Sequence, residues 1–253
     1  MVDGLSVSRR PGPGARVVFV HGVMDRAGGF AKVLRRLPEL SLVRYDRRGY
    51  GDSQGGPLHE TLDGHVDDLL TVIGEQPSVV VGHSLGGILA LSASIRRPDL
   101  VRAVAAYETP MPWSPWWTEP TQSAAVHAGP VEQDPEDAAE RFLRRMLTDE
   151  LWDRFPPSMK RARLAEGHAL LSEMRAMRDA GVYLHTTDIV VPVVAGHGTR
   201  SKRMHVESAR ALSVEAADGE LIIIEGAGHT AHYTHPDDFA AFVRRTVAKA
   251  DRR

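Results

Sequence analysis

The sequence has no cysteine among its 253 residues, so disulfides, cysteine nucleophiles and thiolate metal sites are excluded. It also lacks an excess of charge of either sign: 31 Lys and Arg residues balance 33 Asp and Glu residues, and no global field favours nucleic acid or an anionic membrane. No apolar run approaches the roughly 18 residues of a membrane span, and residues 1–14 lack the apolar segment of a signal peptide. We therefore expect a soluble cytoplasmic protein that acts on a small molecule, without nucleic-acid or membrane partners.

Short apolar runs alternate along the chain with longer segments of helical character. The runs predict strands at 16–20, 42–45, 78–82, 101–107, 189–195 and 221–225, and the segments between them predict helices at 29–37, 59–74, 86–97, 205–214 and 237–250. Several runs are apolar throughout, as in parallel strands that are covered on both faces. This alternation predicts an α/β protein with a parallel sheet and crossover helices.

One long segment interrupts the alternation, because about 80 residues pass without a convincing strand where connections usually take about 2–6 residues. Residues 136–151 and 157–178 within it carry apolar side chains close to 3.6-residue spacing, which predicts amphipathic helices. Taken alone, these stripes indicate only that the helices pack onto the core. We predict a core domain of residues 1–109 and 188–253 and a helical cap of residues 110–187.

A G-x-S-x-G motif spans residues 82–86, with Ser84 at its centre, and lies between an apolar run and a helical segment. Strand, motif and helix in this order are typical of a nucleophile elbow, a strained turn that exposes the serine hydroxyl. Glycines flank the serine because larger side chains would collide with the neighbouring backbone. The alternative is that Ser84 only caps the following helix.

Three further motifs occur in the same chain order as in the α/β-hydrolase family, which the sequence resembles outside the insertion. A strand ends in His21-Gly22, residues 46–53 form a D-x-R-G-x-G-x-S turn, and residues 226–229 read Gly-Ala-Gly-His. The resemblance implies the α/β-hydrolase fold: a mostly parallel central sheet with helices on both faces and a helical cap insertion. It also implies that the backbone N–H groups of Val23 and Leu85 form the oxyanion hole.

His229 is the predicted general base, because a serine hydroxyl needs a neutral imidazole to take its proton. His232 and His235 complete an H-x-x-H-x-x-H run that offers metal binding as an alternative. No H-E-x-x-H motif accompanies the run, and the resemblance already accounts for His229, so we predict no metal. We expect His83 to have a packing or hydrogen-bonding role and His21 to brace the oxyanion loop.

The predicted acid departs from the family pattern, because Ser201 stands where the family's G-x-x-D loop has its acid. A serine cannot supply the charge that orients an imidazole. Glu108 follows the strand at 101–107, and some family members, including haloalkane dehalogenases, carry their acid at that strand end. We therefore predict Glu108 as the third triad member, and we expect that Ser201 cannot substitute for it and that Ser201→Ala does little. Asp188 is the runner-up, but it precedes its strand and so lies at the wrong edge of the sheet.

The predicted reaction is hydrolysis through an acyl-enzyme, and the chemistry requires no cofactor. We expect a small ester, lactone or thioester with an apolar or aromatic group, bound beneath the cap. The candidate substrate-binding residues are Trp113, Trp116, Trp117 and His168. Hydrolysis of a C–C bond in a β-diketone is an alternative on the same site, and a small-molecule receptor with little turnover is an alternative of another class.

Overall fold

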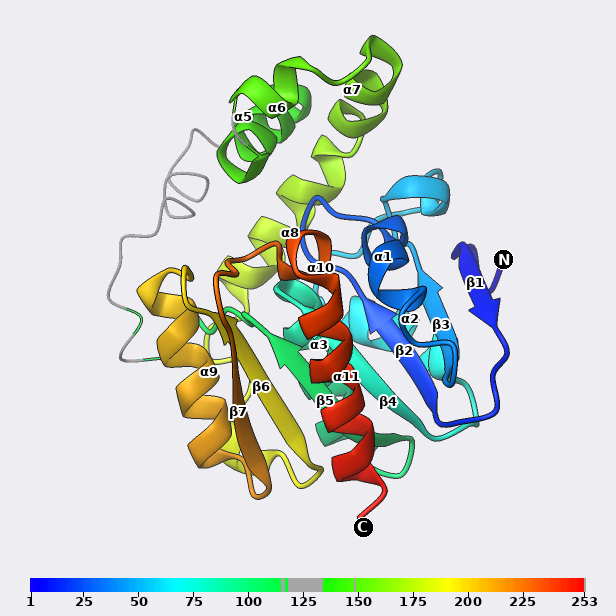
Figure 1. Ribbon diagram of the computed structural model, residues 1–253. Coiled ribbons are helices and arrows are strands. Elements are labelled where there is room, and N and C mark those ends of the chain that lie inside the picture. Colours follow the sequence, from blue (N-terminus) through cyan, green and yellow to red (C-terminus); the bar gives the residue numbers. More distant parts are fainter. Residues whose placement is uncertain (115–116, 118–133, 148, 253) are drawn as a thin grey trace.

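The computed structural model describes residues 1–114, 117, 134–147 and 149–252 (Figure 1). Within these residues, seven strands form one sheet in the order β1-β3-β2-β4-β5-β6-β7. The strands are β1 (Val7–Arg10), β2 (Arg16–Val20), β3 (Ser41–Tyr45), β4 (Ser78–His83), β5 (Val101–Tyr107), β6 (Val193–Gly198) and β7 (Gly219–Ile224). Only β1 runs antiparallel to its neighbour in this sheet, so the prediction of a mostly parallel sheet is confirmed.

The sequence pattern missed β1, and it placed the start of β6 four residues too early. The side chains of β1 are only partly buried, because it is an edge strand, so it lacks the apolar run that marks the other strands. The segment before Val193 is apolar and partly buried but forms no regular strand. The predicted start of β6 was too early because these residues are apolar and buried but do not pair with another strand.

Helices cover both faces of the sheet, as predicted (Figure 1). The elements of the core are η1 (Ala27–Phe30), α1 (Ala31–Leu34), η2 (Gly51–Ser53), α2 (Leu62–Ile73), α3 (Leu85–Arg96), η3 (Thr186–Asp188), α9 (Arg203–Glu215), α10 (Ala231–Thr234) and α11 (Pro236–Ala250). Side chains alternate across β2: Val18 and Val20 pack with α2, α3 and α9, whereas Val17 and Phe19 pack with α1 and α11. The sheet is therefore buried between two apolar layers, and its carboxyl edge is left for polar residues.

Among the described residues, four further α-helices lie between β5 and β6, above the carboxyl edge of the sheet (Figure 1). They are α5 (Pro135–Leu147), α6 (Asp149–Asp153), α7 (Pro157–Leu164) and α8 (Gly167–Asp179). Leu143, Leu170 and Met174 of these helices are buried in a separate apolar cluster. Tyr50, which follows β3, belongs to the same cluster. None of the helices among the described residues is long and apolar enough to cross a membrane.

Buried charges join α8 to the core. Arg47 and Glu173 form an ion pair in which each side chain is 1% exposed. The Tyr50 hydroxyl donates a 2.7 Å hydrogen bond to the second oxygen of Glu173. Burial raises the pKa of the Glu173 carboxyl, and the Arg47 charge opposes that rise. Because an unpaired charge in this place would be very costly, the pair fixes where α8 contacts the sheet edge.

We expect Glu173→Ala to lower the free energy of unfolding by about 3–5 kcal/mol, because it leaves the buried Arg47 charge without its partner. Asp179→Ala is the matched control on the same helix: it removes an exposed ion pair with Arg178 and should cost less than about 1 kcal/mol. Denaturant unfolding of the two variants measures both values. Equal losses would contradict a special role for the buried pair.

Candidate active site

Ser84 occupies the turn between β4 and α3. Its backbone has φ 54° and ψ −126°, a conformation that residues other than glycine rarely adopt. The hydroxyl makes no capping hydrogen bond to α3, so the alternative role as a helix cap is not realised. Strain held at a partly exposed side chain of this kind is a mark of a functional residue.

Two glycines allow the turn to pack against the neighbouring backbone. A Cβ atom on Gly86 would lie 2.2 Å from the Val20 carbonyl oxygen, and one on Gly22 would lie 2.9 Å from Ser84 Cβ. Both distances are far below van der Waals contact, so neither position accepts a side chain without movement of the backbone. The second contact also shows that the loop after β2 lies directly against Ser84.

That loop is braced by His21 and Arg47. The Arg47 backbone N–H donates to His21 Nε2 at 2.9 Å, so the ring proton lies on Nδ1, which donates to the Gly22 carbonyl at 2.8 Å. The Arg47 guanidinium donates to the carbonyls of His21 and Gly22, both at 2.9 Å. Burial, together with the Arg47 charge, lowers the pKa of His21 to about 3. These hydrogen bonds hold the backbone of the loop that continues to Val23.

Glu108 and His229 lie together at the carboxyl edge of the sheet. The His229 Nδ1 atom is 2.7 Å from Glu108 Oε2, although the two residues are 121 positions apart. Ser201 donates a hydrogen bond to the other Glu108 oxygen and accepts one from the Gly198 N–H at 2.8 Å. Ser201 is therefore a direct partner of the carboxylate.

The surroundings keep Glu108 ionised in spite of its complete burial. Burial alone would raise the pKa of this carboxyl, but the hydrogen bond and charge of His229, with contributions from His205 and Ser201, outweigh it and lower the pKa. An ionised carboxylate accepts hydrogen bonds only, so the proton in the contact with His229 lies on Nδ1. The other ring nitrogen, Nε2, is then free to accept a proton.

His83 holds the backbone of the histidine loop. Its Nε2 atom is 2.7 Å from the His229 carbonyl oxygen, to which it must donate. The Tyr107 hydroxyl donates to the preceding carbonyl, that of Gly228, at 3.1 Å. Burial lowers the pKa of His83 well below its ordinary value, so the ring is neutral. The residue before Ser84 thus positions the loop that carries His229, which agrees with the expected hydrogen-bonding role.

The other predicted residues lie in different surroundings. Trp117 is partly buried, and its ring centroid is 6.1 Å from that of His205, whereas Trp113 packs edge-on to Tyr183 at 6.3 Å. His168 is exposed in the first turn of α8, and Trp116 lies outside the described residues. Asp188 ends η3 before β6 begins, as expected, and so lies at the opposite edge of the sheet from Glu108.

Sequence reasoning missed His205 and Asp25. The His205 ring stacks on His229 with centroids 4.8 Å apart, and its Nε2 atom is 4.0 Å from Glu108. Burial, followed by the nearby His229, lowers the pKa of His205 to about 3, so it is a neutral neighbour of the pair. Asp25 accepts hydrogen bonds from residues of α10. No local motif marks either residue, because their partners come from distant segments.

The chain belongs to the α/β-hydrolase family, whose model, described as "Alpha/beta hydrolase family", matches residues 17–242. The 2-(acetamidomethylene)succinate hydrolase of Mesorhizobium japonicum is 24% identical over 247 residues, which cover 90% of this chain and 86% of that protein. The pimeloyl-(acyl-carrier protein) methyl ester esterase of Chromobacterium violaceum is 27% identical over 237 residues, which cover 90% and 92%. These similarities support hydrolase activity.

Solved structures show the same fold. The enol-lactonase from Burkholderia xenovorans LB400 has a TM-score of 0.73 at 20% identity, with 98% of both chains covered. A lipase structure from Acinetobacter baumannii AYE, described as putative, has a TM-score of 0.80 at 14% identity and covers 99% of this chain and 90% of that one. At these identities the likeness shows the fold alone. The α/β-hydrolase fold predicted from the motifs is confirmed.

The contact between Gly86 and Val20 gives a test of the turn. Gly86→Ala should destabilise the protein by at least the roughly 1–3 kcal/mol typical of overpacking, because the added methyl group meets rigid backbone. Gly28→Ala is the control, since a Cβ there meets nothing within 4 Å. Denaturant unfolding compares the two, and a Gly86→Ala variant as stable as Gly28→Ala would refute the close approach.

Proposed function

We propose that the protein is a serine hydrolase in which Ser84 is the nucleophile, His229 the general base and Glu108 the acid. The observation that carries the proposal is the 2.7 Å contact between His229 Nδ1 and an ionised Glu108, in the same site as a serine in a strained turn. A carboxylate on Nδ1 leaves Nε2 as the basic nitrogen, which is the tautomer that a base for serine needs. The reaction that we propose for this arrangement is acyl transfer through Ser84.

The proposed reaction begins when His229 Nε2 takes the Ser84 hydroxyl proton and Oγ attacks the substrate carbonyl carbon. The resulting oxyanion accepts hydrogen bonds from the backbone N–H groups of Val23 and Leu85. Leu85 begins α3, so its N–H points out of the helix N-terminus, where negative charge is stabilised. The imidazolium then gives its proton to the leaving group, and a water molecule activated by His229 hydrolyses the acyl-enzyme.

The proposed substrate is a small carboxylic ester, lactone or thioester with an apolar or aromatic acyl or alcohol part. Support comes from the described tryptophans of the segment before α5, because Trp117 contacts His205, which in turn stacks on His229. Relatives act on a methyl ester and on 2-(acetamidomethylene)succinate, and an enol-lactonase shares the fold, which fits carbonyl substrates of this class. Substrate binding is therefore proposed beside Trp117 and His205, next to His229.

We further propose that residues 110–187 form the cap of this site. Arg163, near the end of α7, donates to the Met24 carbonyl, and Arg26 donates to Glu166 at 2.6 Å. Both contacts join the cap helices to the loop that follows Val23. The cap is thus attached to the segment that supplies one of the two proposed oxyanion donors, so its position bears directly on the site.

Ser84→Ala and His229→Ala should each lower the turnover of short p-nitrophenyl esters by several orders of magnitude while leaving the protein folded, since triad members act as a unit. A fluorophosphonate probe should label the wild type and fail to label Ser84→Ala. Labelling that survives in Ser84→Ala would show that another residue is the nucleophile. A labelled wild type without ester turnover would favour the receptor alternative.

Glu108→Gln should lower turnover by about 10⁴-fold, as expected when a triad acid is made neutral. Ser201 donates to Glu108 in the wild type, because a carboxylate only accepts, and keeping this direction pairs its hydroxyl with the oxygen of the new amide. The amide NH₂ then faces His229 Nδ1 and forces the ring proton onto Nε2. Steady-state kinetics of the folded variant measure the loss.

Ser201→Ala is the matched control for this carboxylate. It removes one hydrogen bond but leaves the Glu108 charge and its contact with His229, so we expect a loss of roughly tenfold or less, in line with about 1.5 kcal/mol for one such bond. Unimpaired hydrolysis by Glu108→Gln would remove Glu108 from the triad. A loss in Ser201→Ala as large as that in Glu108→Gln would mean that the serine does more than orient the acid.

A further inference from the structure

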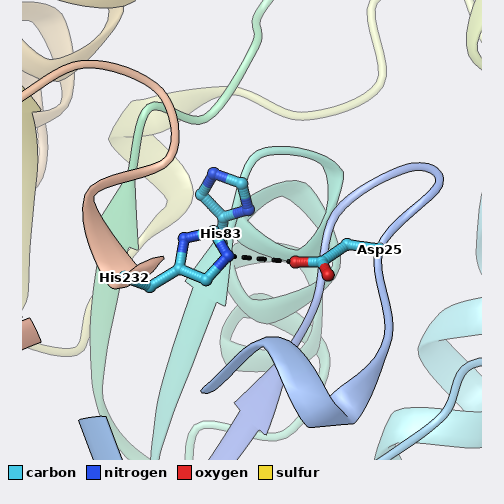
Figure 2. Close-up of side chains that lie close together, drawn as sticks. All are labelled: Asp25, His83 and His232. Atoms are coloured by element: carbon cyan, nitrogen blue, oxygen red, sulfur yellow. Dashed lines mark hydrogen bonds and ion pairs between the residues drawn. The ribbon is translucent and has the colours of Figure 1, made fainter. Parts of the chain in front are cut away.

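A second cluster of polar side chains lies beside the proposed triad and takes no part in the proposed reaction. Asp25 comes from the loop after β2, His83 from the end of β4, and His232 from α10 (Figure 2). One ligand atom of each residue lies within 4.8 Å of the others. Three segments far apart in the sequence thus bring two imidazoles and a carboxylate together.

His83 supplies an acceptor that the protein itself does not use. Because its Nε2 atom donates to the His229 carbonyl, its Nδ1 atom carries a lone pair. That atom is buried and has no hydrogen-bond partner, in a side chain that is only 4% exposed. In Figure 2, Nδ1 faces the side on which Asp25 and His232 meet. A buried acceptor without a donor is unfavourable unless something else occupies that place.

Asp25 is held in a defined orientation. Its Oδ1 atom accepts hydrogen bonds from the Tyr233 hydroxyl at 2.6 Å and the Arg26 N–H at 2.8 Å. Its Oδ2 atom is left with His232 Nε2 at 3.1 Å. Metal-binding carboxylates are typically oriented in this way by outer hydrogen bonds, whereas the Nδ1 atom of His232 is buried and has no hydrogen-bond partner.

We propose that Asp25, His83 and His232 form a binding site for a divalent transition-metal ion of the Zn²⁺ type. Two imidazole nitrogens and one carboxylate oxygen are a donor set that Zn²⁺ takes, with a fourth position for water. His83 would bind through Nδ1, Asp25 through Oδ2 and His232 through Nε2, the remaining proton of His232 then lying on Nδ1. The prediction from sequence that the chain holds no metal is replaced by this proposal.

Binding would draw the three segments together. Ligands at about 2.0–2.1 Å from a tetrahedral ion lie roughly 3.3 Å apart, which is less than the 4.8 Å limit within which these atoms now lie. Asp25 is two residues after Val23, His83 is next to Ser84, and His232 is three residues after His229. An ion at this site would therefore join the proposed oxyanion loop, nucleophile and histidine loop, and thermal stability should rise with its concentration.

The test is titration of the untagged full-length protein with Co²⁺, whose visible absorption reports four-coordinate binding, followed by displacement with Zn²⁺. We expect one Co²⁺ per chain. Outer-shell changes alone typically cost about 10–100-fold in affinity, so loss of a ligand in Asp25→Asn or His232→Gln should weaken binding by roughly 100-fold or more. Tyr233→Phe, which removes only a hydrogen bond to Asp25 at an exposed residue, should weaken it by about tenfold.

Two control variants locate the ion. His235→Gln alters the third histidine of the H-x-x-H-x-x-H run, outside the cluster, and should bind Co²⁺ as the wild type does. A second group of described residues, Glu108, His205 and His229, also places a carboxylate near two imidazoles. His205→Gln alters that group and should still bind Co²⁺. Loss in His205→Gln with retention in His232→Gln would move the ion to the proposed triad and overturn the proposal.

The remaining outcomes are also decisive. The absence of saturable Co²⁺ binding by the folded wild type would overturn the proposal. Co²⁺ binding that is unchanged in Tyr233→Phe and in either ligand variant would also overturn the proposal. If the ligand variants fail to fold, Tyr233→Phe still decides, because its expected tenfold loss depends on Asp25 alone. None of these measurements uses ester turnover, so failure here leaves the proposed hydrolase untouched.

Discussion

The position of every proposed catalytic group depends on the turn between β4 and α3, where backbone atoms approach one another at distances that only glycine allows. Gly86 lies against the Val20 carbonyl, and Gly22 lies against Ser84 itself. Ser84 itself has a positive φ in this turn, and the loop after β2 lies at its side. The buried Arg47, which holds the carbonyls of that loop, then links the turn to the cap through Glu173.

The proposed acid, Glu108, lies at the end of a different strand from the one that the family pattern predicts. The end of β5 pairs with β6, so Glu108 lies beside the loop in which the family's acid is expected. Ser201 in that loop cannot carry a charge, but it donates to Glu108 and accepts from Gly198. The loop therefore keeps a share in orienting the histidine, although the charge has moved to the neighbouring strand.

What the sequence predicts well is what depends on neighbours along the chain. The motif around Ser84 and the apolar runs of the inner strands come from local sterics and burial, and Glu108 follows from its place at a strand end. His205, Asp25 and the edge strand β1 could not be predicted in this way. Their surroundings come from long-range packing, and an edge strand with polar side chains has no apolar run to mark it.

His83 connects the two groups of histidines at the site. One of its nitrogens is committed to the His229 carbonyl, which places the proposed base, and this commitment leaves the other nitrogen as a buried acceptor toward Asp25 and His232. The same hydrogen bond that orders the histidine loop therefore creates the unused lone pair, so the two features cannot be altered independently at this residue.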